Sequence, residues 1–292
     1  MTKTSLYLAS LVLVAFSASL LAQEWHQVGD NKTQGISGVA AIDDTHFLVV
    51  HDNKKPDQPR LGLVEWQKGQ KPALTPLKWC DDTLPIDLEA VTAVPDHKGD
   101  YLVLESKGQV SRIHLEEQGS ACKTLMRFPL PGITQESNLE GLSLYCRRSG
   151  VCVLLWAERG DDKTPANLSW ASFDLEKNTV ANKVEHFPFK APYPETNLRS
   201  ISDIVVDQYG TVLVSATSDP GDDGPFKSAI YTLGKFSAKG ILTIAEPKTP
   251  DFKFDAENIK IEALTQPASG SLLMGSDDEN KGGRLTLLTV RK

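Results

Sequence analysis

One six-residue pattern occurs five times in this chain, as GISGVA at 35–40, DLEAVT at 87–92, NLEGLS at 138–143, SISDIV at 200–205 and KIEALT at 260–265. Each copy of this repeated hexapeptide places an aliphatic residue before a Ser or Glu, and four copies place Gly or Ala after it. The copies start roughly 50–60 residues apart, close to the length of one propeller blade or a similar all-β unit. The spacing predicts five equivalent all-β units.

Turn residues and β-prone runs follow every copy, which predicts further strands in each unit. Second strands are expected at 46–50, 101–104, 151–156, 211–215 and 271–274, and third strands at 61–66, 109–115, 168–175, 228–233 and 284–290. Fourth strands are expected at 74–79, 123–128, 183–189 and 240–245. The fifth unit has no predicted fourth strand, and the strand-like segment 24–28 can supply it.

Five four-stranded antiparallel units closed by a strand from the other terminus indicate an all-β fold, a five-bladed β-propeller over residues 23–292. Ring closure also removes the sheet edges that an open array would expose. A pair of β-sandwiches is the alternative, but it does not predict five copies of one hexapeptide.

Residues 1–22 are expected to be a signal peptide, with Lys3 before an apolar stretch and a cleavage site near Ala22. An uncleaved anchor is the alternative, although the stretch is short for a spanning helix of about 20 residues. The mature protein is then periplasmic or secreted, with no membrane contact. The formal net charge of −7 argues against a nucleic-acid polymer as partner.

Four cysteines fit an oxidising compartment. Cys146 and Cys152 flank a turn-like stretch, which predicts a cross-strand disulfide. Cys80 and Cys122 would pair by default, but the predicted strands place them at opposite ends of neighbouring outer strands.

The third position of the hexapeptide predicts a metal site, because the first strand of each propeller blade lines the central axis. This position holds Ser37, Glu89, Glu140, Ser202 and Glu262. Like-charge repulsion among three converging carboxylates requires compensation. One Ca²⁺ ion, which takes 6–8 oxygen ligands, would provide it. The alternative is that the glutamates bind backbone groups or water.

The order Ser, Glu, Glu, Ser, Glu resembles the calcium-activated nucleotidase (apyrase) family of five-bladed propellers with a central Ca²⁺. The resemblance is clearest at 201–204, 211–219, 229–231 and 260–264. The chain is also similar to esterase-like and phytase-like bacterial propellers, through 140–142 and 276–278. These resemblances imply the fold and the metal ion more firmly than a substrate. They weaken at 51–55, where the nucleotidase pattern has Asp-Asp-Arg.

Acidic residues end every second strand, on the face where a substrate would lie. The candidate catalytic residues are Asp52, Glu105, Glu158, Asp219 and Asp277, interleaved with basic side chains. Around a bound Ca²⁺ they would hold a phosphate and orient water. His51 is the group on this face that titrates near neutral pH, so it is a candidate general base.

Two functions from different classes follow. One is a Ca²⁺-dependent hydrolase of phosphate esters or anhydrides, acting on a small anionic substrate. The other is a non-catalytic, Ca²⁺-stabilised binding propeller. A third interpretation makes Glu89, Glu140 and Glu262 the carboxylates of a glycosidase, which leaves the two serines without a role. Ser-His-Asp catalysis lacks its Gly-x-Ser-x-Gly motif.

Overall fold

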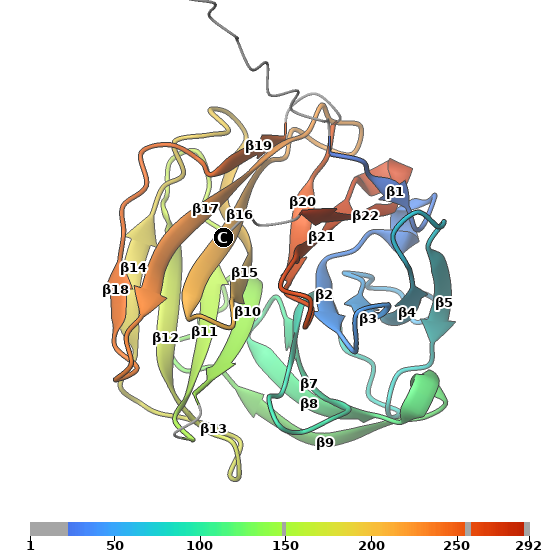
Figure 1. The fold of residues 1–292 in the computed structure, drawn as a ribbon, viewed down its shortest axis with the longest axis horizontal. Helices are drawn as coiled ribbons and strands as arrows, with labels where there is room; N and C mark the ends of the chain where they lie inside the picture. The colour runs from blue at the N-terminus through green and yellow to red at the C-terminus, as the bar shows by residue number, and fades with distance from the viewer. Residues whose placement is uncertain (1–22, 148–149, 255–257, 289–292) are drawn as a thin grey trace, which may run out of the picture.

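The chain forms five twisted antiparallel sheets arranged around one axis, as Figure 1 shows. The computed structural model describes all residues except 1–22, 148–149, 255–257 and 289–292, so the predicted signal peptide lies outside the described residues. The all-β, five-bladed prediction is therefore confirmed, and the hexapeptide counts the blades.

The first two blades each have four strands in sequence order. Blade 1 contains β2 (Gly38–Ala41), β3 (His46–Val50), β4 (Leu61–Glu65) and β5 (Ala73–Leu77). Blade 2 contains β6 (Leu88–Ala93), β7 (Asp100–Glu105), β8 (Gln109–Leu115) and β9 (Cys122–Pro129). Short 3-10 turns lie at Lys32–Gln34, Glu117–Gly119 and Glu279–Lys281.

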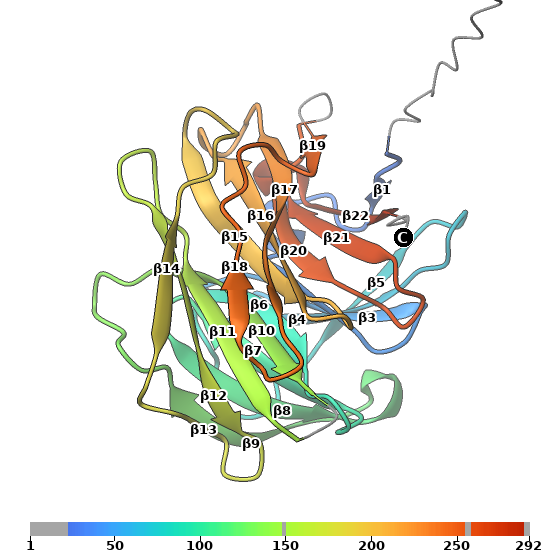
Figure 2. The same cartoon turned by 60° about the vertical axis from the view of Figure 1, so that its left-hand side comes forward.

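Blades 3 and 4 differ from the prediction because two short strands share each outer edge. Blade 3 contains β10 (Leu139–Cys146), β11 (Cys152–Glu158), β12 (Ala166–Asp174), β13 (Thr179–Val180) and β14 (Glu185–Phe189). Blade 4 contains β15 (Leu198–Val206), β16 (Thr211–Ser218), β17 (Lys227–Phe236), β18 (Leu242–Ile244) and β19 (Phe252–Phe254). Both β13 and β14 pair with β12, at different heights along it (Figure 2). The long third strands β12 and β17 make room for two partners.

Blade 5 is completed from the N-terminal side, as the sequence predicts. It contains β20 (Ile261–Thr265), β21 (Leu272–Asp277) and β22 (Gly283–Leu288), and β1 (His26–Gln27) pairs antiparallel with β22. The Val28 N–H also donates to the Gly283 carbonyl at 2.9 Å. The ring is thus closed by main-chain hydrogen bonds between the two ends of the described chain.

Five hydrophobic clusters fill the spaces between neighbouring blades. The aliphatic residues at hexapeptide positions 2 and 5 enter a different cluster in each copy: Ile36 and Val39, Leu88 and Val91, Leu139 and Leu142, Ile201 and Ile204, Ile261 and Leu264. Burial of each such side chain stabilises the fold by about 1.5–3 kcal/mol. The aliphatic part of the hexapeptide therefore joins the blades.

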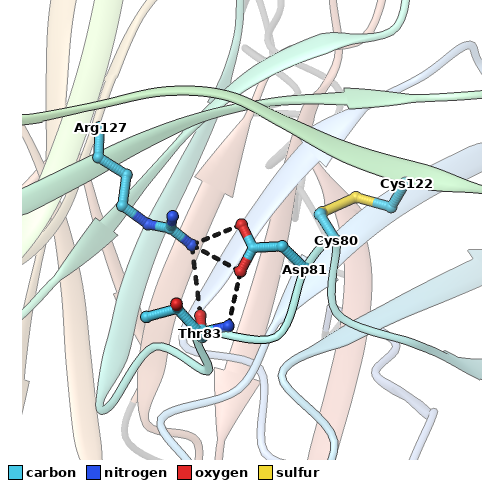
Figure 3. The surroundings of a disulfide bond; sticks show 5 residues. All are labelled: Cys80, Asp81, Thr83, Cys122 and Arg127. Atoms are coloured by element: carbon cyan, nitrogen blue, oxygen red, sulfur yellow. Dashed lines mark hydrogen bonds and ion pairs between the residues drawn. A yellow bond between two sulfur atoms is a disulfide. The ribbon is translucent and has the colours of Figure 1, made fainter.

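Two disulfides are present. The predicted Cys146–Cys152 bridge is confirmed and links β10 to β11. Cys80 and Cys122 also form a bridge, which ties the outer edges of blades 1 and 2 beside the Asp81–Arg127 ion pair (Figure 3). The expectation that they lie at opposite ends is wrong, because strand twist accumulates across a blade and turns its outer strand away from the axis. Two disulfides fit an oxidising compartment such as the periplasm or the cell exterior.

Among the described residues, no helix is long and apolar enough to cross a membrane.

Candidate functional site

In four of the five blades, the third position of the hexapeptide lies at an irregularity in the first strand. The pairing between the first and second strands shifts at residues 88–90, 139–141, 199–203 and 261–263. Such bulges re-aim a side chain out of the regular alternation of a sheet. This is how Glu89, Glu140 and Glu262 leave the blade interior and turn toward one another at one end of the axis.

We call this group the carboxylate cluster: Glu89, Glu140 and Glu262, the acidic neighbours Asp52, Asp219, Asp277 and Glu279, and the cations Arg159, Arg199 and Lys260. The ion pairs below show that blades 3, 4 and 5 meet there. The charges of Glu140 and Glu262 also act on Glu89, so blade 2 belongs to the same site.

Arg199 is the central cation of the cluster. Its Nη1 lies 3.4 Å from Oε1 of Glu262 and 3.9 Å from Oε1 of Glu140, and its Nη2 binds Asp219. Arg159 also approaches Oε1 of Glu140, at 3.3 Å. One guanidinium therefore connects the first strands of blades 3 and 5 with the end of the second strand of blade 4.

Lys260 is a second, almost fully buried cation. Its Nζ lies 2.6 Å from Glu279, 3.2 Å from Glu262 and 3.5 Å from Asp219. Only 3% of its side chain is exposed, so these carboxylates are what keeps the ammonium charged. Lys260 opens the fifth hexapeptide and Arg199 directly precedes the fourth. A basic residue beside only these two copies is the signal that the sequence interpretation missed.

Glu89 differs from the other two glutamates because no cation of the described chain forms an ion pair with it. Within the described residues, its carboxylate makes no ion pair or hydrogen bond, and it is 9% exposed. Burial raises the pKa of Glu89 well above its ordinary value, and the negative charges of Glu140, Asp87, Asp52 and Glu262 add to this. Among the three glutamates, Glu89 is thus the one whose burial most strongly favours the protonated form.

The pKa of Glu140 is raised only to about 6. Burial is the main cause, and the Arg199 guanidinium opposes it. Burial also raises the pKa of Glu262, against the opposing effect of Lys260 and then Arg199. The three glutamates therefore occupy different electrostatic environments within one site, a feature found where carboxylates take different acid–base roles.

Three of the predicted catalytic candidates belong to this cluster. Asp219 binds Arg199 and Lys260. Asp277 is buried, and its pKa is raised by burial and by the Glu262 charge. The pKa of Asp52 is also raised by burial, which Lys260 opposes.

The other two candidates, Glu105 and Glu158, lie opposite Leu88 and Leu139 in the strand pairing, but within the described residues neither makes an ion pair with the cluster. Glu105 accepts a hydrogen bond from the Ile86 N–H at 2.9 Å, so it fixes the loop that enters blade 2. Glu158 ends β11, and no ion pair between it and the cluster is found in the described part of the chain.

His51 is enclosed rather than placed at the surface of this face. It is 1% exposed, and its Nδ1 lies 2.5 Å from the Gly35 carbonyl oxygen. Burial lowers the pKa of the ring, which keeps the imidazole neutral. The arrangement positions the first hexapeptide and does not support the general-base role expected for His51.

The predicted Ca²⁺ ligands differ in the partners that their side chains already have. The Oγ of Ser37 is buried and has no hydrogen-bond partner in the described structure. Glu89 makes no ion pair or hydrogen bond within the described residues. Arg199 already approaches Glu140 and Glu262, Lys260 pairs with Glu262, and Ser202 Oγ lies 2.9 Å from Thr217 Oγ1. No three His, Cys, Asp or Glu residues among those described form a ready metal-binding group. Arg199 and Lys260 thus neutralise much of the negative charge that the sequence interpretation assigned to a metal ion. A Ca²⁺ ion held by all five residues stays a prediction.

Comparison with known proteins places the chain by fold. No family model and no curated protein matches it. Among solved structures, it is similar to an endo-arabinase from Bacteroides thetaiotaomicron, with TM-score 0.55, 9% identity and coverage of 91% of this chain and 99% of that one.

Two further solved structures are similar to this chain over most of its length. An endo-1,4-beta-xylanase from the same organism has TM-score 0.56 and 10% identity, covering 90% of this chain and 97% of that chain. A thermostable family-43 glycoside hydrolase has TM-score 0.50 and 9% identity, covering 87% and 88%. Identities this low establish the fold alone, and the nucleotidase resemblance remains an interpretation of the sequence. What the comparisons establish is that this chain is a five-bladed β-propeller.

Proposed function

We propose that the chain is a hydrolase of glycosidic bonds that works through the carboxylate cluster. The observation that carries the proposal is the difference between two neighbouring glutamates. Glu89 retains its proton because it is buried among other carboxylates, whereas Arg199 favours the ionised form of Glu140. Glycoside hydrolysis needs such a pair, one carboxylic acid and one carboxylate.

In this scheme, Glu89 protonates the leaving-group oxygen of the glycosidic bond. Glu140 acts as the carboxylate, either as base or as nucleophile. Arg199 and Lys260 pair with Glu262, and Arg199 also approaches Glu140, so these cations fix the positions of the two glutamates beside Glu89. The three similar structures are those of glycan-cleaving enzymes, which supports a glycan over other substrates of a hydrolase.

Phosphate esters, the substrates expected from the sequence, fit the cluster less well. Arg199 and Lys260 are engaged by Glu262, Asp219 and Glu279, so neither presents a free cation to a phosphate. The surrounding carboxylates would repel a second anion. A neutral glycan meets no such repulsion.

A substrate panel tests the proposal. We expect purified protein to cleave arabinan, xylan or galactan or the matching aryl glycosides, and to leave nucleotides and phosphomonoesters intact. Glu89→Gln and Glu140→Gln should each lower kcat by about 10²–10⁴-fold, the usual effect of an acid–base catalyst. Glu136→Gln, an exposed glutamate four residues before Glu140, is the matched control. Turnover of phosphate substrates that depends on Glu89, without any glycan cleavage, contradicts the assignment.

The pH dependence of activity gives a second test. Glu140 has to be ionised to act, and its pKa is about 6. We therefore expect kcat/KM to fall as the pH drops below about 6 and to level off above it until Glu89 ionises. Arg199→Gln removes the cation that favours ionised Glu140 and should move the acidic limb to higher pH.

We also propose, as a second candidate, that a Ca²⁺ ion binds at Ser37 and Glu89. Its support is that Ser37 Oγ is buried without a hydrogen-bond partner in the described structure, and that the Glu89 carboxylate makes no ion pair or hydrogen bond there. Dialysis against a chelator followed by added Ca²⁺ should then raise the melting temperature, and Glu89→Gln should abolish the rise. An unchanged melting temperature in the wild type excludes a Ca²⁺ ion at this position.

A further inference from the structure

The three glutamates of the proposed reaction are almost enclosed by the fold. Glu140 and Glu262 are 3% and 4% exposed, and Glu89 is 9% exposed. Their aliphatic neighbours lie in the hydrophobic clusters between blades, so the strands that carry them are fixed in a close-packed core. A glycan has to touch a carboxylic acid and a carboxylate to be hydrolysed. An opening for it has to come from a loop that covers the cluster.

The loop between β16 and β17, residues 219–226, has the anatomy of such a cover. Its two ends are fixed: Asp219 binds both buried cations of the cluster, and Phe226 is fully buried. Between these ends, residues 220–223 and 225 are exposed. A segment with fixed ends and few buried contacts along its length opens more easily than the strands on either side of it.

The loop keeps its shape through its own hydrogen bonds. The Gly221 N–H donates to Oδ1 of Asp219 at 3.1 Å, and the Gly224 N–H donates to the Gly221 carbonyl at 3.0 Å. Both glycines have positive φ, +119° and +72°, which side chains with a Cβ rarely adopt. The loop can therefore leave its place as one preformed turn.

Two polar bridges hold the tip of the loop down. Oδ2 of Asp222 lies 2.8 Å from Nζ of Lys32, in the 3-10 turn that precedes blade 1, and Oδ1 of Asp223 accepts from Nδ2 of Asn280 of blade 5 at 3.2 Å. The Asp222 and Lys32 side chains are 58% and 54% exposed. Exposed ion pairs of this kind are weak and are screened by salt. The bridges therefore act as a latch that thermal motion can release.

The latch lies directly on the carboxylate cluster. Lys32 Nζ is also 3.2 Å from Oε2 of Glu279, whose Oε1 lies 2.6 Å from Nζ of Lys260. Lys260 in turn lies 3.2 Å from Glu262. The exposure of these side chains falls from 54% at Lys32 to 16% at Glu279 and 3% at Lys260. A line of alternating charges thus runs from the loop tip at the surface to Glu262 within the site.

We propose that residues 219–225 form a lid over the carboxylate cluster, latched by Lys32 and Asn280, and that the lid opens to admit the substrate. The role given to the lid rests on the proposed function, whereas its opening is measurable without any substrate. Because the latched protein does not admit a glycan, the latch lowers the apparent affinity by the fraction of molecules that are closed.

Hydrogen exchange with mass spectrometry tests the latch. In Lys32→Gln and Asn280→Ala, which replace exposed side chains, the peptide covering 219–226 should exchange about two- to fivefold faster than in the wild type, as loss of one weak bridge allows. Added salt should speed exchange there in the wild type but not in Lys32→Gln. Lys177→Gln, which breaks an equally exposed ion pair with Asp174 in blade 3, is the matched control and should exchange as the wild type does.

Carboxyl labelling tests whether the lid covers the cluster. A carbodiimide with glycine ethyl ester should label Glu140 and Glu262 about two- to fivefold faster in Lys32→Gln than in the wild type, because the open fraction rises. The exposed Glu65 should be labelled equally in both proteins. Unchanged exchange in both latch variants, or unchanged labelling of Glu140 and Glu262, overturns the lid.

Kinetics separates the lid from the proposed function. On a glycan that the wild type cleaves, Lys32→Gln should lower KM by about two- to fivefold and leave kcat unchanged, because it changes the closed fraction and not the chemical step. An unchanged KM beside faster exchange overturns the role of the lid in substrate entry. If the wild type cleaves no glycan, the proposed function fails, and exchange and labelling alone decide whether the lid exists.

Discussion

Glu89 illustrates how one residue of the hexapeptide sets a pH dependence for the whole protein. Its folded-state pKa lies above the ordinary value of 4.5, so the folded protein holds a proton that the unfolded chain has released. The free energy of unfolding therefore falls as the pH rises from about 4.5 through the folded pKa, with each pKa unit worth about 1.4 kcal/mol.

Glu89→Gln removes the ionisable group and should stabilise the metal-free protein at pH 8 but not at pH 4. Urea unfolding at both pH values measures this. Glu262→Gln is the matched control: it takes a partner from buried Lys260 and should destabilise at pH 8, by about 1–3 kcal/mol. If both substitutions changed the stability at pH 8 in the same direction, the proposed difference between the environments of Glu89 and Glu262 would be contradicted.

Asp203 departs from the small residues found at position 4 of the other hexapeptides, and the structure gives the reason. Its Oδ2 accepts a hydrogen bond from the Leu264 N–H of blade 5 at 2.6 Å. Burial raises the pKa of this carboxyl well above its usual range. A polar side chain is needed here because it satisfies a main-chain donor of the next blade.

Asp203→Ala should cost about 1–3 kcal/mol, because it leaves the Leu264 N–H buried and unpaired. Asp203→Asn keeps an acceptor without a charge and should be the more stable variant at pH 7. Thermal unfolding of the two variants ranks them, and an alanine variant as stable as the asparagine one would refute this role.

At the level of elements, β1 is a short strand with a large effect on blade 5. It pairs with β22, and the Thr286 hydroxyl donates to the Glu24 carbonyl at 2.6 Å. Removal of residues 23–28 should lower the melting temperature and speed amide exchange in β22, while β8 of blade 2 stays protected. Hydrogen exchange with mass spectrometry measures this, and uniform exchange across all blades would indicate that β1 does not act locally.

The first strands also hold each other directly. Ser143 Oγ accepts the Val206 N–H at 3.0 Å, and Thr92 Oγ1 accepts the Leu144 N–H at 3.3 Å. Both acceptors occupy hexapeptide position 6. The hexapeptide thus combines apolar contacts between blades at positions 2 and 5 with polar contacts to the next first strand at positions 4 and 6.

For the whole molecule, the two disulfides should contribute unequally. Cys80–Cys122 closes a separation of 42 residues and Cys146–Cys152 one of 6. The chain-entropy relation gives about 4 kcal/mol for the longer loop and about 2 kcal/mol for the shorter. Denaturant unfolding of the Cys80→Ala/Cys122→Ala and Cys146→Ala/Cys152→Ala double variants should show this order. The reverse order would mean that blades 1 and 2 need no covalent link.

Local pattern was sufficient for most of the fold. β3 and β8 have the predicted bounds, and each other predicted strand differs at its ends or is divided, as in blades 3 and 4. The divided outer strands escaped prediction because an outer strand is half-exposed and its pattern depends on the neighbour it meets. The Cys80–Cys122 bridge was doubted for a similar reason, since twist is a property of the assembled sheet.

The sequence by itself determined the number of blades, the closing strand and the convergence of Glu89, Glu140 and Glu262, because these follow from a pattern repeated along the chain. Only the tertiary structure decided how those carboxylates are compensated. Arg199 and Lys260 reach them across blades 3, 4 and 5, and burial then separates the proton affinities of Glu89 and Glu140. Charge, burial and distance between blades are properties of the closed ring, so no single hexapeptide contains them.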